Sequence, residues 1–232
     1  MYHYFAPMEG LTDSIYRELH HRFFSGIDRY YTPFLSPTVH RKLTAKEERE
    51  LPPADSLDFC VVPQMLTKNA ADFLWLAQEI HNRGYSQVNL NLGCPSGTVV
   101  AKGKGSGMLA DADTLDAFLN GIFAAAPLPI SIKTRLGVQS PEEFRCIMDV
   151  YARYPLAELI VHPRVRKEFY DGNLHMDCFQ YALDTAPFPV CFNGNLCSTR
   201  QIDAFHQAYP TVHAVMPVSY THLRAHETRG NL

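Results

Sequence analysis

Side chains able to do chemistry stand at or just beyond the ends of short apolar segments in this sequence. Cys94 lies in a Gly-Cys-Pro turn directly after the segment QVNLNLG, and Lys133 interrupts the segment PISIKTR. Gln64 is the polar residue of the segment FCVVPQM. If these segments are neighbouring parallel strands, their polar ends converge on one face. The full set of candidates is Pro7, Met8, Glu9, Gln64, Asn89, Asn91, Cys94, Lys133, Arg135, His162, Arg164, Asn193, Gly194 and Asn195.

Each of these side chains admits a chemical role and a structural one. A loop position favours an exposed, functional Cys94, although an average cysteine is a small buried hydrophobe. The Lys133 ammonium needs a polar or anionic partner, which a bound cofactor or a neighbouring carboxylate would supply, and a Schiff-base role stays open. Gln64 suits either the amide edge of a planar heterocycle or nearby backbone. His162 is equally consistent with a core histidine, and the segment 193–195 with a simple turn.

Other chemistries lack their residue patterns. The 11 histidines are scattered and match neither HExxH nor a facial triad, so we expect no metal site. No GxSxG turn points to a serine hydrolase. The six cysteines form no CxxC pair, which excludes zinc-ribbon and thioredoxin patterns and is consistent with reduced thiols in the cytoplasm.

The apolar segments that carry the candidates recur with a regular spacing. Eight of them begin near residues 4, 29, 59, 87, 129, 157, 188 and 212, which is about 30 residues apart, the length of one βα unit. Eight strands that alternate with helices, without an early GxGxxG, favour a (β/α)8 TIM barrel over an open doubly wound sheet.

Amphipathic helices with recognisable ends fill most of the spaces between these segments. Asn69, Asp111 and Ser198 are predicted N-caps, and Ser140 begins a capping box that Glu143 completes. Thr12 or Asp13 is predicted to cap a first helix whose inner face is Ile15, Leu19 and Phe23. Residues 37–57 are expected to form a surface excursion, and residues 92–110 a glycine-rich loop after the fourth strand.

Length and charge limit the function less than the motifs do. The chain has 232 residues with 21 Lys and Arg against 24 Asp and Glu, a net charge of −3. This balance gives no sign of a strongly basic nucleic-acid binder. No apolar run approaches the roughly 20 residues that span a bilayer, and the N-terminus lacks a signal-peptide layout. We therefore expect one cytoplasmic barrel without a membrane segment.

Together the motifs resemble those of the tRNA-dihydrouridine synthases, which are flavin-dependent barrel enzymes. NLNLGCP combined with FAPMEGLTD is the specific part of the resemblance. The resemblance extends over about residues 1–216, in the family's order. It rests on FAPMEGLTD (5–13), VPQML (62–66), NLNLGCP (89–95), GKGSGML (103–109), IKTRLG (132–137), VHPR (161–164) and FNGN (192–195).

The resemblance implies FMN as cofactor, NADPH or NADH as reductant and tRNA as substrate, in a monomeric enzyme. In that family pattern Cys94 is the proton donor, Asn91 holds the target uracil, and Arg135 and Arg164 contact RNA. The residues implied to bind the flavin are Pro7, Met8, Glu9, Gln64, Lys133, His162, Asn193, Gly194 and Asn195.

The end of the sequence departs from the family pattern. Residues 217–232 (PVSYTHLRAHETRGNL) resemble translated adaptor sequence, and the Gly-Arg-Gly turn that completes the phosphate site in the family does not follow Met216. We expect residues 1–216 to form the FMN-binding barrel, incomplete at its last loop, closing helix and helical domain. The alternatives are another FMN-dependent barrel oxidoreductase, of the dihydroorotate-dehydrogenase kind, and a non-catalytic remnant.

Overall fold

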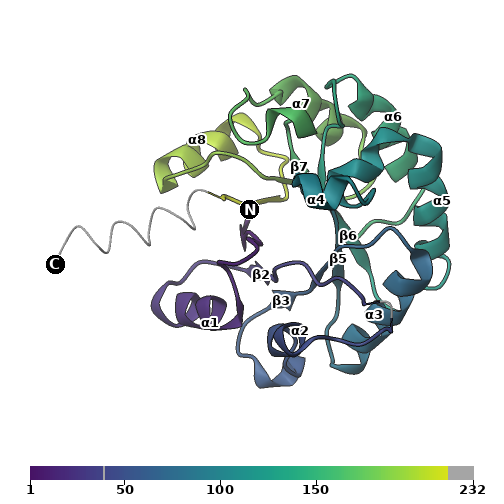
Figure 1. Cartoon of the computed structure of the whole chain (residues 1–232). Helices are drawn as coiled ribbons and strands as arrows, with labels where there is room; N and C mark the ends of the chain where they lie inside the picture. Colours follow the sequence, from purple (N-terminus) through teal and green to yellow (C-terminus); the bar gives the residue numbers. More distant parts are fainter. Residues whose placement is uncertain (39, 219–232) are drawn as a thin grey trace.

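The computed structural model describes residues 1–38 and 40–218 and forms a barrel of parallel strands inside a ring of helices (Figure 1). The strand segments run in the spatial order β3-β2-β1-β9-β8-β7-β6-β5-β4. Their bounds are β1 Tyr2–Phe5, β2 Arg29–Tyr31, β3 Val61–Val62, β4 Gln64–Met65, β5 Val88–Leu92, β6 Ile130–Arg135, β7 Glu158–His162, β8 Val190–Phe192 and β9 Ala214–Val215. All eight predicted strand segments are present.

The third predicted segment forms two strand pieces because Pro63 interrupts it. β3 pairs with β2, and β4 pairs with β5, so the two halves of this one segment join the two ends of the sheet order. Proline has no N–H for a ladder, which explains the break. The eight strands therefore run once around a barrel, and the prediction of a (β/α)8 fold is confirmed.

The barrel wall is continuous where the first and last strands meet. Tyr2 and His3 of β1 lie in parallel register with Ala214 and Val215 of β9, and the Tyr2 N–H donates to His213 O at 3.1 Å. Within residues 1–218 the wall thus has strands at every position. The predicted foreign-looking tail lies outside the described residues, apart from Pro217 and Val218.

Helices follow most strands on the outside of the barrel. Their bounds are α1 Ser14–Phe23, α2 Ala45–Glu50, α3 Ala70–Asn82, α4 Gly97–Val100, α5 Ala112–Phe123, α6 Glu143–Tyr151, α7 Met176–Thr185 and α8 Thr199–Ala208, with short 3₁₀ turns η1 Ala54–Ser56, η2 Gly105–Ala110 and η3 Arg166–Glu168. No helix among the described residues is long and apolar enough to span a membrane.

The predicted caps of α3, α5 and α8 are confirmed. The side chains of Asn69, Asp111 and Ser198 accept from backbone N–H groups in the first turns of these helices. The carboxylate of Glu143 accepts the Ser140 N–H at 3.0 Å, which is half of the predicted capping box. These caps satisfy N–H groups that have no partner within the helix.

The predicted inner face of α1 is wrong. Ile15, Leu19 and Phe23 are 65%, 47% and 68% exposed, whereas Arg17 and His20 are buried. Arg17 donates from Nη1 to Glu50 Oε2 at 2.7 Å, so α1 is fixed to α2 by a buried ion pair rather than by apolar packing. The predicted surface excursion 37–57 is therefore partly helical and contributes a buried carboxylate.

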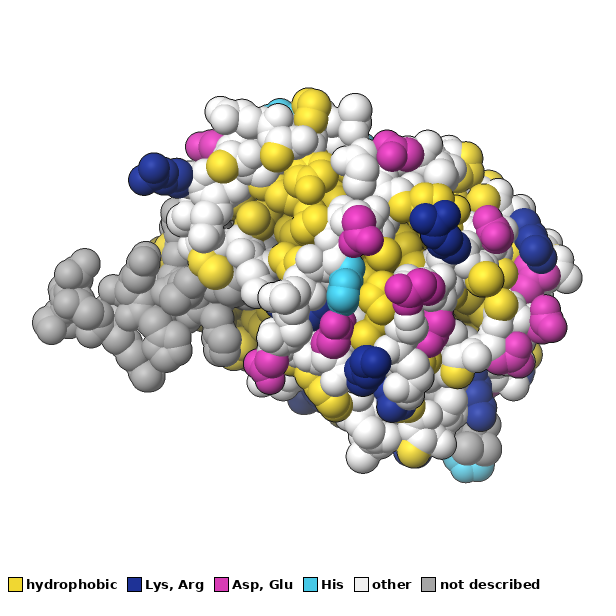
Figure 2. Space-filling model, turned by 90° about the horizontal axis from the view of Figure 1, so that it is seen from above, with side chains coloured by type: hydrophobic (Ala, Val, Ile, Leu, Met, Phe, Trp, Pro, Cys, Tyr) yellow, Lys and Arg dark blue, Asp and Glu magenta, His cyan; other side chains and the backbone are white. Residues whose placement is uncertain are grey.

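The surface carries charges of both signs, mixed with apolar side chains. Figure 2 shows the face that Figure 1 has uppermost, around α7 and α8; acidic and basic side chains are scattered over it, and hydrophobic side chains gather in a hollow. No single sign of charge dominates this face.

A buried carboxyl group organises the amino-terminal end of the barrel interior. Glu158, the first residue of β7, is 1% exposed and accepts hydrogen bonds from Tyr4 Oη at 2.9 Å and Tyr31 Oη at 3.2 Å. Arg29 Nη1 and His213 Nε2 lie 3.9 and 3.7 Å from the carboxylate. Burial raises the pKa of Glu158 to about 7, against the opposing effect of the tyrosine hydroxyls and Arg29.

This raised pKa predicts a dependence of stability on pH. The folded state holds a proton on Glu158 between about pH 4.5 and 7, where the unfolded state does not. The stabilisation is therefore complete at low pH and lost as the pH rises through 7. In urea unfolding, the difference in free energy of unfolding between the protein and Glu158→Gln is expected to change by about 3 kcal/mol between pH 5 and pH 8.

The exposed Glu18 provides the matched control for this prediction. Glu18→Gln should follow the pH profile of the unsubstituted protein. A Glu158→Gln variant that also follows that profile would show that Glu158 stays ionised in the folded state.

Candidate active site

A cavity of about 490 Å³ opens at the carboxyl ends of the barrel strands. Ten of the predicted site residues line it, namely Pro7, Met8, Glu9, Gln64, Asn91, Cys94, Lys133, Arg135, His162 and Asn193. The other candidates, Asn89, Arg164, Gly194 and Asn195, do not line it. The volume is in the range of small-molecule and cofactor sites.

A row of side-chain amides crosses the barrel interior beneath the cavity. Asn89 Nδ2 donates to Ser131 Oγ at 2.9 Å, Gln64 Nε2 donates to Asn89 Oδ1 at 2.8 Å, and Asn91 Nδ2 donates to Gln64 Oε1 at 2.8 Å. These bonds join β4, β5 and β6. Each of the Gln64 and Asn91 amides keeps one N–H beyond this row, so both retain a donor for a ligand.

The amide row also fixes the loop that carries Cys94. Asn91 Oδ1 accepts the N–H groups of Gly93 at 3.0 Å and Cys94 at 2.9 Å. From the other side, Ser106 Oγ donates to Cys94 O at 2.8 Å. Gly105 has φ +57°, and a Cβ there would lie 2.9 Å from Cys94 O. The glycine-rich segment predicted as a loop is thus folded into α4 and η2, and it holds the half-buried thiol at the cavity.

Cationic side chains make part of the cavity electropositive. Lys133 of β6 lies in register with Asn91 of β5, and its ammonium has no hydrogen bond or ion pair with any residue that the structure describes. Burial, followed by repulsion from Arg135, lowers its pKa to about 8. Burial, followed by repulsion from the cations Lys133, Arg135 and Arg164, lowers the pKa of His162 well below its usual value. The cavity therefore contains a half-buried ammonium, which favours an anionic ligand, and a neutral imidazole.

The two predicted RNA-contacting arginines have structural partners. Arg135 donates from Nε to Gly93 O at 2.9 Å and from Nη1 to Val165 O at 3.2 Å. Arg164 donates from Nε to Gly172 O at 2.6 Å, and its Nη1 lies 3.1 Å from His162 Nε2. Since a guanidinium only donates, His162 Nε2 is the acceptor, in agreement with a neutral ring.

The predicted phosphate-binding segment is positioned by β8 and β9. Asn193 Nδ2 donates to Met216 O at 2.6 Å, whereas the buried Asn193 Oδ1 has no partner among the described residues. Asn195 Oδ1 lies 3.4 Å from Arg164 Nη1. A buried acceptor without a donor is unfavourable, so Asn193 marks a place where a ligand donor or water is expected.

The loop after β1 lines the cavity mainly with backbone and apolar atoms rather than with charged groups. Met8 N donates to Thr12 Oγ1 at 2.8 Å, which closes the turn Pro7–Thr12. The Glu9 carboxylate forms an exposed ion pair with Lys46 of α2. Pro7 and Met8 thus present a rigid apolar edge to the cavity, and Glu9 lies at its rim.

Sequence reasoning missed Tyr170, which also lines the cavity. Its ring centroid lies 6.2 Å from that of His162 and 5.3 Å from Arg135 Cζ. The neighbouring Phe169 has a positive φ of 48° and is half exposed. Tyr170 belongs to a loop and not to a strand end. The one signal for it in the sequence is the aromatic pair Phe169 and Tyr170 directly after the basic residues 164–167. The other missed lining residues are Pro33, Phe34, Gly93, Pro95 and Val218.

Within residues 1–38 and 40–218, no group of three or more His, Cys, Asp or Glu side chains is arranged to hold a metal ion.

The family model described as dihydrouridine synthase matches residues 4–220. The chain belongs to the dihydrouridine synthase family.

Curated relatives of this dihydrouridine synthase family member agree with the match. A probable tRNA-dihydrouridine synthase 1 of Synechocystis is 28% identical over 200 residues, which are 83% of this chain and 54% of the relative. A tRNA-dihydrouridine(16) synthase of Pseudomonas putida is 30% identical over 199 residues, covering 82% of this chain and 61% of the relative. The chain thus spans little more than half the length of these relatives.

A solved structure supports the fold alone. A phosphonopyruvate hydrolase, in complex with oxalate and Mg²⁺, superposes with a TM-score of 0.60 at 12% identity, covering 99% of this chain and 80% of the hydrolase chain. At this identity the similarity concerns the barrel and not the chemistry.

The close packing behind the phosphate-binding segment generates a prediction. A Cβ at Gly194 would overlap the ring of Phe192, which packs against Phe205 with centroids 4.3 Å apart. Gly194→Ala is expected to lower the free energy of unfolding by about 1–3 kcal/mol, because the aromatic core must shift. Urea unfolding measures this change. Gly97→Ala is the control, since no atom lies within 4 Å of the position that its methyl group would take, and it should not destabilise the protein.

Proposed function

We propose that this protein reduces the 5,6-double bond of uridine in tRNA with FMN as cofactor and Cys94 as proton donor. The observation that carries the proposal is the presence, in one cavity, of the Cys94 thiol and of the half-buried ammonium of Lys133, which has no hydrogen-bond or ion-pair partner among the described residues. Family membership supports the reaction, and the relatives named tRNA-dihydrouridine synthases support the substrate.

The residues of the cavity suit a flavin phosphate. Lys133 provides a half-buried positive charge for the electron-rich edge of the ring, and Gln64 provides a remaining amide N–H. The buried Asn193 Oδ1 has no donor among the described residues, so it is proposed to accept from a hydroxyl group of the cofactor or from water, because a phosphate dianion offers no donor. The proposed cofactor-contacting set is Pro7, Met8, Glu9, Gln64, Lys133, His162, Asn193, Gly194 and Asn195.

When bound and reduced by NADPH or NADH, the flavin supplies a hydride for C6 of the uracil ring. The protein supplies the remaining parts of the reaction. The Cys94 thiol donates a proton to C5, and solvent reprotonates the thiolate. Asn91, whose second amide N–H is available, orients the uracil, and Tyr170 offers a ring against which the nucleotide can stack.

The substrate base must leave the folded tRNA to reach the cavity floor. Extrusion of a base costs a few kcal/mol, which contacts with the rim must offset. The exposed Phe169 and Tyr170 are proposed RNA-contacting residues at this rim. Arg135 and Arg164, which are buried, are proposed to add positive charge beneath them. Aromatic and basic side chains at one opening are typical of surfaces that bind unstacked nucleotides.

We place the reaction in the cytoplasm, with the protein as a monomer. The thiols of this sequence, without a CxxC pair, are consistent with a reducing compartment. The cavity is built by residues of one chain, so catalysis needs no second copy.

The decisive experiment combines the protein with FMN, NADPH and an unmodified tRNA transcript, and measures dihydrouridine by mass spectrometry of the nucleosides. Cys94→Ala is expected to retain FMN and to lose about 10²–10⁴-fold in turnover, the usual contribution of a general acid. Cys60→Ala, which removes a thiol outside the cavity, should keep full turnover.

Three results would contradict the proposal. If no dihydrouridine forms although FMN is bound, the protein does not catalyse the proposed reaction. Reduction of free pyrimidines in preference to tRNA would indicate a dihydroorotate-dehydrogenase-like enzyme. Binding of tRNA without any FMN would indicate a non-catalytic protein.

The lowered pKa of Lys133 predicts how flavin affinity depends on pH. The ammonium is charged below about pH 8 and attracts the anionic cofactor, so the affinity should fall as the pH rises from 7 to 9. Lys133→Met is expected to weaken FMN binding at pH 7 by about 10- to 100-fold, the loss of one charged hydrogen bond.

Quenching of FMN fluorescence measures both effects. Lys133→Met should also give a flatter pH profile, whereas Lys102→Met, on the exposed loop, should bind like the unsubstituted protein. Equal affinities of the Lys133→Met and Lys102→Met variants would show that Lys133 does not face the cofactor.

A further inference from the structure

The ring of His162, the last residue of β7, has an arginine bound at one of its two nitrogens. Arg164 Nη1 lies 3.1 Å from His162 Nε2, and the two residues are only 3% and 5% exposed. A guanidinium has N–H groups to donate and no lone pair to accept, so Nε2 is the acceptor and carries no proton. The single ring proton of a neutral His162 therefore lies on Nδ1.

Two further contacts fix the orientation of the Arg164 guanidinium. Its Nε donates to Gly172 O at 2.6 Å, and its Nη1 lies 3.4 Å from Asn195 Oδ1. These acceptors belong to the loops after β7 and β8, so the guanidinium joins the two loops. Because a guanidinium is a rigid planar fork, the bond at Nε also sets the direction in which Nη1 points.

The surroundings of His162 disfavour a second ring proton. Among the described residues, the charged side chains that act on the ring are all cations, namely Lys133 and Arg135 of β6 and Arg164. The carboxylates of Glu168 and Asp171 act on Arg164 instead, and the aromatic ring of Tyr170 lies beside the imidazole, with centroids 6.2 Å apart. Burial and then these cations lower the pKa of His162 well below its usual value, so the ring is neutral at physiological pH.

The other ring nitrogen, Nδ1, is open to the candidate active site. It has no hydrogen bond with a described residue. The side-chain atoms that are both buried and without a partner in the described part of the chain are Arg17 Nε, Gln87 Nε2 and Asn193 Oδ1. His162 Nδ1 is not one of them, so it is accessible, and the cavity of about 490 Å³ is the opening that His162 lines.

We propose that Arg164 is a positioning residue that fixes His162 as the Nδ1–H tautomer, so that the ring presents a permanent hydrogen-bond donor to the cavity. Without a donor at Nε2, an imidazole exchanges its proton between the two nitrogens. Together with the ammonium of Lys133, the fixed Nδ1–H suits an acceptor oxygen of an anionic ligand. The inference goes beyond the proposed function, because it concerns the protonation of the ring and holds for any ligand of this cavity.

A fixed tautomer also separates the role of His162 from that of Cys94. A ring whose Nε2 lone pair is occupied and whose charged form is disfavoured neither takes nor gives a proton near neutral pH. His162 therefore does not compete with the Cys94 thiol, which lines the same cavity, as a proton donor. It acts on a ligand by orienting it.

Nitrogen NMR of the whole chain with isotope-labelled histidine measures the tautomer, because protonated and unprotonated ring nitrogens have well-separated chemical shifts. His162→Gln identifies the His162 signals among those of the 11 histidines. We expect a protonated Nδ1 and an unprotonated Nε2, unchanged between about pH 6 and pH 8. A protonated Nε2, or a ring that gains a second proton in this range, overturns the proposal.

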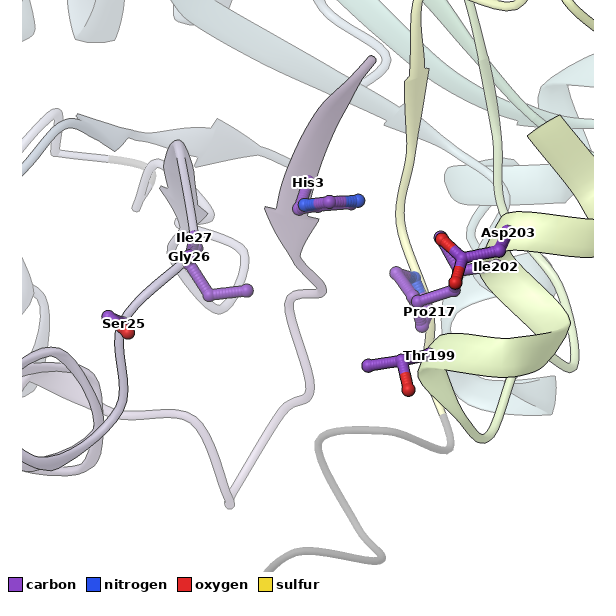
Figure 3. Close-up of a pocket in the computed structure, with 8 residues that line it drawn as sticks. All are labelled: His3, Ser25, Gly26, Ile27, Thr199, Ile202, Asp203 and Pro217. Carbon is purple, nitrogen blue, oxygen red and sulfur yellow. The ribbon is translucent and has the colours of Figure 1, made fainter.

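His3 is the internal reference for a ring without a fixed tautomer. Figure 3 shows its ring pointing from β1 toward α8, in a second cavity of about 270 Å³ that shares no lining residue with the candidate active site. Its backbone N–H donates to Asp28 Oδ2 at 2.7 Å, whereas its ring has no hydrogen bond with a described residue. The two nitrogens of His3 should therefore share the proton and give averaged shifts.

Arg164→Met tests the positioning role. Loss of the donor should leave Nε2 free, so that His162 shows averaged shifts as His3 does. Lys167→Met, which removes an exposed cation from the same loop, should leave the His162 signals unchanged.

A further variant separates the position of the proton from the structure of the loop. Glu168 accepts from Val165 N at 2.7 Å and bonds to His175, so Glu168→Gln weakens the loop after β7 without touching His162. It should keep the Nδ1–H tautomer. Unchanged His162 signals in Arg164→Met, or an equal change in Glu168→Gln, would show that the arginine does not set the tautomer. Should Arg164→Met not fold, the spectrum of the unsubstituted protein decides the proposal alone.

Discussion

Closure of the parallel barrel is the constraint on which the rest of the structure depends. Only when β9 pairs with β1 do all eight strands present their carboxyl ends to one opening, so that residues as distant as Met8 and Asn193 line the same cavity. The closing contact is short, because β9 has two residues and pairs with two residues of β1. The same step of the ring lacks an outer helix within residues 1–218. One of the short contacts of the wall therefore coincides with its least covered outer face among the described residues.

The ionisable groups at the two ends of the barrel interior are neutralised in different ways. At the amino-terminal end, Glu158 is satisfied by Tyr4 and Tyr31 and by a raised pKa, so the protein itself neutralises the group. An apolar layer that includes Ile160 and Cys191 separates it from the carboxyl end. There the half-buried Lys133 ammonium has no partner among the described residues, an arrangement that favours an anionic ligand. The first arrangement stabilises the fold, whereas the second favours binding.

The sequence was sufficient for features that depend on periodicity and strand position. The eight strands, the caps of α3 and α5, and ten cavity residues follow from apolar spacing and from the rule that barrel sites lie at strand ends. Tertiary context decided the remainder. The predicted inner face of α1 has helical spacing, but spacing does not tell which side of a helix meets the core, and the Arg17–Glu50 ion pair turned this face outward. Tyr170 depends on a loop conformation with a positive φ at Phe169, which no local pattern encodes.

The arginines of the site show why a residue's type does not settle its role. Arg135 and Arg164 were expected to contact RNA, yet their guanidinium groups donate to backbone carbonyls at Gly93, Val165 and Gly172. The bonds of Arg135 fix the Cys94 loop and the loop after β7 relative to one another, and the bond of Arg164 to Gly172 O holds the loop after β7. Loss of Arg135 would therefore displace the thiol and Tyr170 even if no nucleotide touched the guanidinium. A role in RNA binding is separable from this positioning role only through groups that remain exposed, and the ring of Tyr170 beside Arg135 is the clearest of them.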